Sequence, residues 1–228
     1  MSLVVYRGPS QYDPRVIIRA VLVTDSANSK TGNMSQLFIL HDTVAPHVAQ
    51  RTGDDSAVCG HCPLRPANSG GCYVLTFQGP LSTWKATTGR PVAGAGQVAR
   101  ALRGRTLRLG AYGDPAALPV YVIQHLARLV NGKATGYTHG WRSRPDLARF
   151  CMASVETTHD QIEATSRGWR TFRVTTESAP QLPTEILCPS EKVECAQCLL
   201  CRGSSLKARS VTIPAHGTFS KRALAVVQ

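Results

Sequence analysis

Short apolar runs separated by polar segments predict a hairpin near the start of the chain. Residues 16–23 and 36–40 are rich in large apolar and β-branched side chains, and residues 25–33 between them are small and polar, as in a turn. We expect two antiparallel strands here and a short helix within residues 41–55. This hairpin defines an N-terminal extension over residues 1–58.

Beyond residue 72, short apolar runs alternate with patterns of helical period. Strands are predicted at residues 73–77, 106–111, 134–138, 151–155 and 171–175, and helices at 97–103, 118–129, 145–150 and 160–167. Strands separated by such helices are typical of right-handed βαβ units. We therefore predict an α/β fold whose parallel sheet is open or curled into a partial (β/α) barrel, over residues 59–180. A last strand is expected at residues 211–214.

Polar and glycine-rich residues follow several of these strands. They are Gln78, residues 112–115, His139, Glu156 and residues 175–177. Because ligands bind at the carboxyl ends of parallel strands, this pattern predicts a functional face there. Turn chemistry alone also places glycine and proline at such junctions, so both interpretations stay open.

Three cysteines and a histidine lie in a loop rich in glycine and proline. The cysteines are Cys59, Cys62 and Cys72, and the histidine is His61. Such a loop buries little apolar surface, so a metal or an iron–sulfur cluster is expected to order it. A zinc site would take His61 or a more distant histidine as fourth ligand, whereas a four-iron cluster accepts three thiolates. The spacing leaves both metals open.

A second cysteine group defines a C-terminal metal-binding extension over residues 181–228. Its members are Cys188, Cys195, Cys198 and Cys201. Four thiolates are a complete ligand set for zinc or for a four-iron cluster. The remaining cysteine, Cys151, lies in an apolar run and is predicted to be a buried small hydrophobic residue.

Charge and hydropathy bear on the partners. The 228 residues include 26 Lys and Arg against 14 Asp and Glu, a formal net charge of +12. This excess favours a nucleic-acid partner on a basic surface, or else a solvated basic face. No apolar run approaches the roughly 20 residues of a membrane span, so no membrane partner is expected. The start of the chain has no long apolar segment, so we expect a cytoplasmic protein, in which reduced thiols bind metal.

The order of these features resembles that of the radical S-adenosylmethionine enzyme superfamily. The shared features are a three-cysteine loop, an aromatic residue, Tyr73, directly after the last cysteine, and a strand that ends in Gly-Ala-Tyr-Gly-Asp-Pro at residues 110–115. In that family a partial barrel holds a four-iron cluster on three cysteines, and a Gly-Gly-Glu-Pro-like turn binds the amine of the cofactor. The spacing here, C-x2-C-x9-C, differs from the usual C-x3-C-x2-C.

The resemblance implies one or two four-iron clusters and S-adenosylmethionine as cofactor. It implies that the first cysteine group holds the catalytic cluster, and that the cofactor-binding turn consists of Gly110, Gly113, Asp114 and Pro115. The chain is also similar to uncharacterised proteins encoded by bacteriophages. No catalytic residue or substrate is predicted. The competing prediction is a basic nucleic-acid-binding protein, stabilised by zinc and without redox activity.

Overall fold

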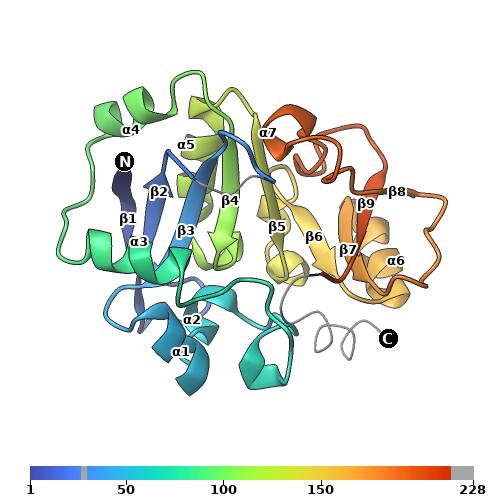
Figure 1. Ribbon diagram of the computed structural model, residues 1–228, viewed down its shortest axis with the longest axis horizontal. Coiled ribbons are helices and arrows are strands. Elements are labelled where there is room, and N and C mark those ends of the chain that lie inside the picture. The colour runs from blue at the N-terminus through green and yellow to red at the C-terminus, as the bar shows by residue number, and fades with distance from the viewer. Residues whose placement is uncertain (27–29, 217–228) are drawn as a thin grey trace.

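The computed structural model describes residues 1–26 and 30–216, which form a mixed sheet of nine strands with helices around it (Figure 1). The strands are β1 (Ser2–Pro9), β2 (Ile17–Val23), β3 (Ser35–His41), β4 (Leu107–Tyr112), β5 (Ala134–Thr138), β6 (Met152–Val155), β7 (Thr171–Thr175), β8 (Glu185–Leu187) and β9 (Ser210–Pro214). Their order across the sheet is β1-β2-β3-β4-β5-β6-β7-β9-β8. The first three strands pair antiparallel, and every later pair is parallel. The sheet is open, with β1 and β8 at its edges.

The helices follow from the sequence patterns between the strands. They are α1 (Pro46–Thr52), α2 (Ser56–Cys59), α3 (Gly79–Thr87), α4 (Ala95–Leu102), α5 (Val120–Leu129), α6 (Thr158–Ser166) and α7 (Cys195–Cys198). In α5 the buried side chains Val122, Ile123 and Leu126 recur every three or four residues, so one face packs on the sheet. Within the described ranges, no helix has the length and apolar character needed to cross a membrane.

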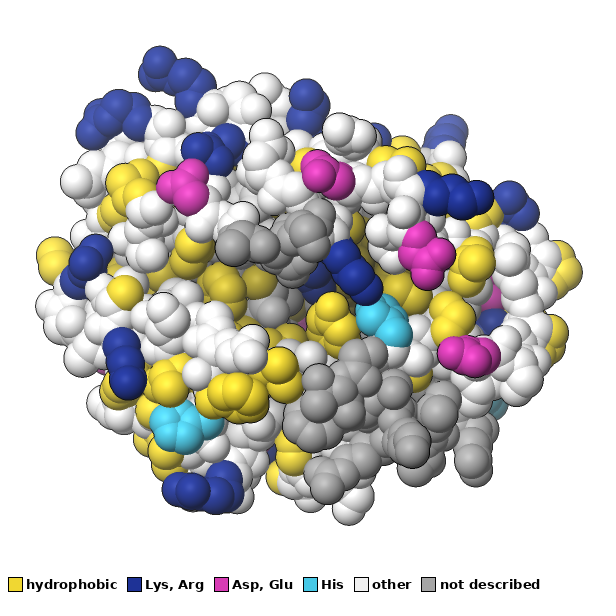
Figure 2. Space-filling view, in the orientation of Figure 1, with side chains coloured by type: hydrophobic (Ala, Val, Ile, Leu, Met, Phe, Trp, Pro, Cys, Tyr) yellow, Lys and Arg dark blue, Asp and Glu magenta, His cyan; other side chains and the backbone are white. Residues whose placement is uncertain are grey.

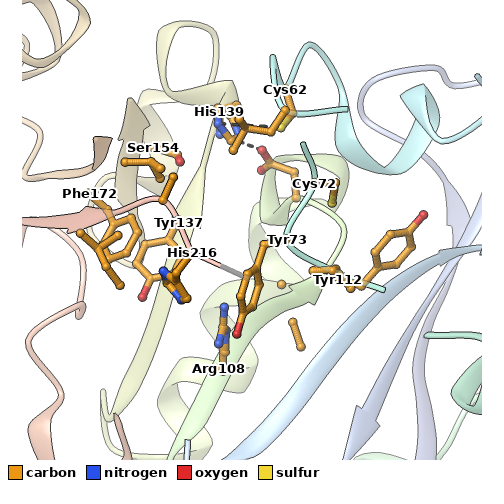
Figure 3. Close-up of a pocket in the computed structure, with 18 of the residues that line it drawn as sticks. Cys62, Cys72, Tyr73, Arg108, Tyr112, Tyr137, His139, Ser154, Phe172 and His216 are labelled. Atoms are coloured by element: carbon orange, nitrogen blue, oxygen red, sulfur yellow. Dashed lines mark hydrogen bonds between the residues drawn. The ribbon is translucent and has the colours of Figure 1, made fainter. Parts of the chain in front are cut away.

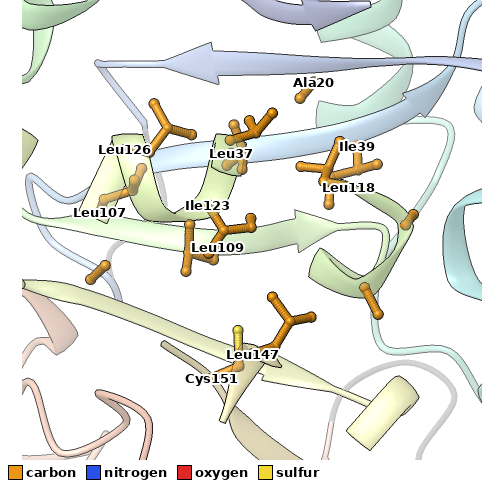
Figure 4. Packing of buried hydrophobic residues seen from close by; sticks show 14 of the residues in the cluster. Ala20, Leu37, Ile39, Leu107, Leu109, Leu118, Ile123, Leu126, Leu147 and Cys151 are labelled. Carbon is orange, nitrogen blue, oxygen red and sulfur yellow. The ribbon is translucent and has the colours of Figure 1, made fainter. Parts of the chain in front are cut away.

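The hydrophobic core lies between the central strands and α5 (Figure 4). Leu37 of β3 and Leu109 of β4 are fully buried beside Ile123 of α5. Each such side chain contributes about 1.5–3 kcal/mol by leaving water. Cys151 is also fully buried in this cluster, which confirms the prediction of a small core residue.

The predicted hairpin and most later elements are confirmed. Strands β2 and β3 form the hairpin, and β1, which was not predicted, extends it on the outer side. The predicted helix at residues 145–150 is a short 3-10 turn over Pro145–Leu147. The α/β class and a mostly parallel sheet are therefore confirmed. The division at residues 58 and 180 stays a prediction, since one sheet runs through all three proposed segments.

The predicted strand at residues 73–77 is wrong. These residues are bends and a turn, and the side chains of Tyr73 and Phe77 are 47% and 58% exposed. The physical reason is that β3 pairs directly with β4, which leaves no position in the sheet for a strand between them. The series of parallel strands begins instead at β3, the second strand of the hairpin.

Candidate functional site

A buried ion pair holds the loop that carries the first cysteine group. The Arg65 guanidinium donates through Nε to Asp55 Oδ1 at 3.1 Å, and through its other nitrogens to the carbonyl oxygens of Gly60 and Gly53 at 3.1 and 2.9 Å. The side chains of Arg65 and Asp55 are 10% and 3% exposed. One planar guanidinium thus ties the end of α1 to the start of the cysteine loop, where apolar packing is scarce.

The turn after β4 is tied to the same loop and to β5. The backbone amide of Asp114 donates to the carbonyl of Val58 at 2.7 Å. Its carboxylate accepts hydrogen bonds from the amide of Ala116, the hydroxyl of Thr138 and the amide of His139, at 2.6–2.8 Å. All three donors belong to the protein, so the Asp114 carboxylate positions the turn, and it is the backbone of the turn that borders the site.

Glycine is required at both predicted positions of this turn. Gly110 and Gly113 have φ values of 72° and 79°, a region that L side chains rarely adopt. A Cβ atom on Gly110 would lie 2.6 Å from the carbonyl oxygen of Gly113, and one on Gly113 would lie 2.6 Å from that of Ile39. The motif that suggested a cofactor-binding turn is therefore also the sequence that this backbone needs.

We expect Gly113→Ala to destabilise the protein by about 2–5 kcal/mol. The positive φ costs about 1–2 kcal/mol and the clash with the Ile39 carbonyl about 1–3 kcal/mol more. Gly168→Ala is the matched control, because Gly168 has φ 81° and open space around the added methyl. Urea unfolding measures the difference, and equal losses in the two variants would contradict the packing described for Gly113.

Both cysteine groups border one cavity of about 280 Å³. Cys59, Cys62 and Cys72 line it together with residues 110–114 of the turn, and Cys188 and Cys195 line it from the second group. Figure 3 shows Cys62 at the top of this cavity, Cys72 beside Tyr112 at the right, and Tyr137 and Phe172 at the left. In Figure 2 the corresponding face is hollowed, with apolar, basic and histidine side chains around the hollow. Of the residues predicted to form a functional face, residues 112–114 and His139 line this cavity, and Gln78, Glu156 and residues 175–177 do not.

The second cysteine group lies near the amino ends of the central strands. The amide of Gly136, in β5, donates to the carbonyl of Cys201, and the amide of Cys195 donates to the carbonyl of Lys30, just before β3. A second arginine holds the segment that follows. The Arg170 guanidinium donates to the carbonyl oxygens of Leu200, Gly203, Ala208 and Arg209, at 2.6–3.1 Å. The two groups therefore face the cavity from opposite ends of the strands.

Three half-buried thiols, those of Cys59, Cys72 and Cys201, hold their protons at neutral pH. Burial raises the pKa of Cys72 to about 11 and that of Cys201 to about 12. Burial, followed by the charges of Cys62 and Cys72, raises the pKa of Cys59 as well. Metal ions bind the thiolate form, so a metal must displace these protons.

Metal loading should therefore release protons and strengthen with pH. Each thiol that loses its proton on binding makes the apparent affinity rise about tenfold per pH unit below its pKa. We expect this dependence to persist up to at least pH 8, because the pKa values of the Cys59, Cys72 and Cys201 thiols lie above it. Zinc titrations in weakly buffered solution, followed with a pH indicator, measure the protons released. Loading without proton release would show that the thiols are not the ligands.

His139 connects the first cysteine group to a carboxylate. Its Nε2 lies 3.8 Å from the Cys62 sulfur and 2.8 Å from Glu156 Oε1. Burial lowers the pKa of His139, but the neighbouring Cys62 and Glu156 outweigh this effect and raise it well above its usual value. The sequence placed His139 and Glu156 after strands without linking them, because their approach depends on the pairing of β5 with β6.

Another cluster of metal-binding residue types lies on the surface. Ligand atoms of His159, Asp160 and Glu163 lie within 4.8 Å of one another. Arg142 pairs with both carboxylates and Arg167 also pairs with Glu163. A cation would have to displace these arginines, so the cluster is a network of ion pairs.

The predicted residues that line the cavity are Cys59, Cys62, Cys72, Gly110, Gly113, Asp114, Cys188 and Cys195. The predicted residues Pro115, which is buried, Cys198 and Cys201 do not line it. Sequence reasoning missed the contributions of Arg108, Tyr137 and Ser154, which point from consecutive strands into the same cavity. The alternation Leu107, Arg108, Leu109 was the available signal, because it places the arginine on the face opposite the core.

Comparisons of the chain with protein-family models, with curated proteins and with solved structures find no match.

Proposed function

We propose that the chain is an iron–sulfur protein that resembles radical S-adenosylmethionine enzymes. In this proposal Cys59, Cys62 and Cys72 hold a four-iron cluster, and the second cysteine group holds another cluster or metal. The observation that carries it is the cavity that the first cysteine group shares with the Gly110–Asp114 backbone. The cysteines that bind the cluster and the turn that binds the cofactor would then border the same cofactor molecule.

The strand order supports this proposal. Six strands, β3, β4, β5, β6, β7 and β9, lie side by side and parallel. The cysteine loop follows the first of them and the Gly-Asp-Pro turn follows the second, as in the family that the sequence resembles. Side chains from β4 to β9 border the same cavity, as expected if this part of the open sheet curves as a partial barrel.

The ligand atoms of neither cysteine group are gathered into a compact tetrahedral set. Sulfurs around one tetrahedral zinc lie about 3.8 Å apart, given Zn–S bonds of about 2.3 Å. Across the described ranges, no three cysteines of either group have sulfurs that all lie within 4.8 Å of one another. In a four-iron cluster each thiolate binds a different iron atom, so the sulfurs stand further apart.

The residues of this chain would have distinct tasks when the cluster and cofactor are bound. The cluster supplies an electron for the reductive cleavage of S-adenosylmethionine. The first cysteine group binds the cluster, and Arg65 holds that loop in place. Asp114 fixes the turn whose backbone would orient the cofactor's amine, and Val74 and Leu64 help to line an apolar wall that excludes water.

Anaerobic reconstitution with iron and sulfide tests the proposal. We expect a brown protein that consumes S-adenosylmethionine when it is reduced by dithionite, and a protein that stays colourless and binds only zinc would overturn it. The competing proposal has one specific observation in its favour, the exposed basic residues Arg100, Arg103, Arg128 and Lys133, which do not line the cavity. It predicts salt-sensitive binding to DNA or RNA without iron.

A further inference from the structure

Arg108 has neither the carboxylate partners of Arg19 and Arg65 nor the carbonyl partners of Arg170, and among the described arginines with a buried, unpaired Nε, which also include Arg19 and Arg202, it is the one that lines the cavity. Arg19 and Arg65 have carboxylate partners, and Arg170 donates to four carbonyl groups. Arg108 lines the cavity, and its Nε atom is buried without a hydrogen-bond partner. Leaving a guanidinium nitrogen unpaired in a buried position is costly, and no carboxylate of the described residues pairs with Arg108, so this arginine is placed to receive an acidic group from a bound molecule.

The cavity around Arg108 has an excess of positive charge. Lys30 and Arg108 both line it, and Asp114 is the sole carboxylate among the lining residues in the described part of the chain. That carboxylate already accepts three hydrogen bonds from the protein, as described above. An anion entering the cavity would therefore meet Arg108 without competition from a carboxylate among the lining residues.

Aromatic rings surround this guanidinium. It lies 5.9 Å from the centre of the Tyr137 ring, which itself packs 4.1 Å from that of Phe172. The rings of Tyr73 and His216 lie 5.0 Å apart. Figure 3 shows Arg108 among these rings, on the side of the cavity away from Cys62 and His139. Such rings stack against planar groups, and an arginine beside them binds carboxylate or phosphate through paired hydrogen bonds.

We infer that Arg108 binds the acidic group of a small substrate that also carries a planar ring, at the end of the cavity opposite the first cysteine group. The inference deepens the proposed function, since it assigns a substrate class to the same cavity. The Ser154 side chain also borders the cavity and offers a hydroxyl to the bound molecule. Carboxylates and phosphates share the chemistry that Arg108 recognises, so the experiment must compare them.

Equilibrium binding of matched probes to the full-length protein tests the inference. We expect benzoate or phenyl phosphate to bind and neutral benzamide to bind at least about tenfold more weakly, since an ionic hydrogen-bonded pair is lost. Whichever of the two acids binds more tightly identifies the acidic group of the substrate as a carboxylate or a phosphate. Arg108→Met should weaken the binding of the acid by a similar factor. Arg128→Met, which alters an exposed residue outside the cavity, should leave that binding unchanged.

Two further outcomes separate the substrate site from the proposed cofactor site. Saturating S-adenosylhomocysteine should leave the binding of the acid unchanged, and displacement of the acid would show that Arg108 serves the cofactor, which overturns the inference. Equal binding of acid and amide, or full binding by Arg108→Met, also overturns it. A protein that takes up no iron but binds the acid through Arg108 would contradict the proposed function and leave this inference standing.

Discussion

Replacing Cys59 by serine should abolish the consumption of S-adenosylmethionine and remove about half of the iron from the reconstituted protein. Cys59 lines the cavity beside the Gly110–Asp114 turn, and its thiol is close enough to Cys62 and Cys72 for their charges to raise its pKa. A cluster left with two thiolates loses the ligand set that a four-iron centre needs. The second cysteine group keeps all four of its ligands, so its iron should stay.

Cys151→Ala is the control for this experiment. Cys151 is fully buried in the core and belongs to neither cysteine group, so its replacement removes a thiol without touching a proposed ligand. This variant should keep its iron and its activity. Iron and sulfide analysis with a cleavage assay measures both effects. A Cys59→Ser protein that cleaves the cofactor at the rate of the unaltered chain would remove this loop from the proposed mechanism.

Replacing Arg65 by methionine should destabilise the protein by about 3–5 kcal/mol, because Asp55 would be left as a buried charge without a partner. The carbonyl groups of Gly53 and Gly60 would lose their donors at the same time. The exposed pair between Arg15 and Asp13 supplies the control, since the Arg15 side chain is 89% exposed and water replaces its contacts. Arg15→Met should leave the urea unfolding midpoint nearly unchanged.

The same substitution at Arg170 tests whether the two cysteine groups depend on different arginines. Arg170→Met should cost about 3 kcal/mol or more, because four carbonyl groups lose a charged donor. We expect Arg65→Met to impair retention of iron by the first cysteine group, and Arg170→Met to impair retention by the second. Iron content and cofactor cleavage, measured on both folded variants in low urea, distinguish them. Loss of cleavage in both variants to the same extent would show that the two loops do not act separately.

Local sequence patterns predicted most of the fold because those elements depend on local periodicity. The continuous apolar runs of β2 and β3 and the buried stripe of α5 are visible within ten residues. The error at residues 73–77 has a different origin. A short apolar run shows that a segment can form a strand, but the pairing of β3 with β4 decides whether the sheet has a place for it.

The candidate site was less accessible to sequence reasoning, since it is assembled by long-range pairing. Residue types and spacing identified the cysteines and the Gly110–Pro115 turn. Nothing local indicated that Cys188 and Cys59 border one cavity, because this depends on β9 lying beside β7. Arg108 appeared in the sequence as one of several spaced basic residues, and its isolation from carboxylates is a property of the folded chain alone.

The order of the strands has a consequence for how the protein assembles during synthesis. From β1 to β7, each strand pairs with the one made just before it, so the sheet can grow as the chain leaves the ribosome. The loop of the first cysteine group is then tied to the Gly-Asp-Pro turn and to β5 once Thr138 has emerged and reached Asp114. Strand β8 pairs only with β9, so the second group must wait for residues 210–214. Under the proposed function, the first cysteine group could thus receive its cluster on a growing chain, whereas the second group is completed last.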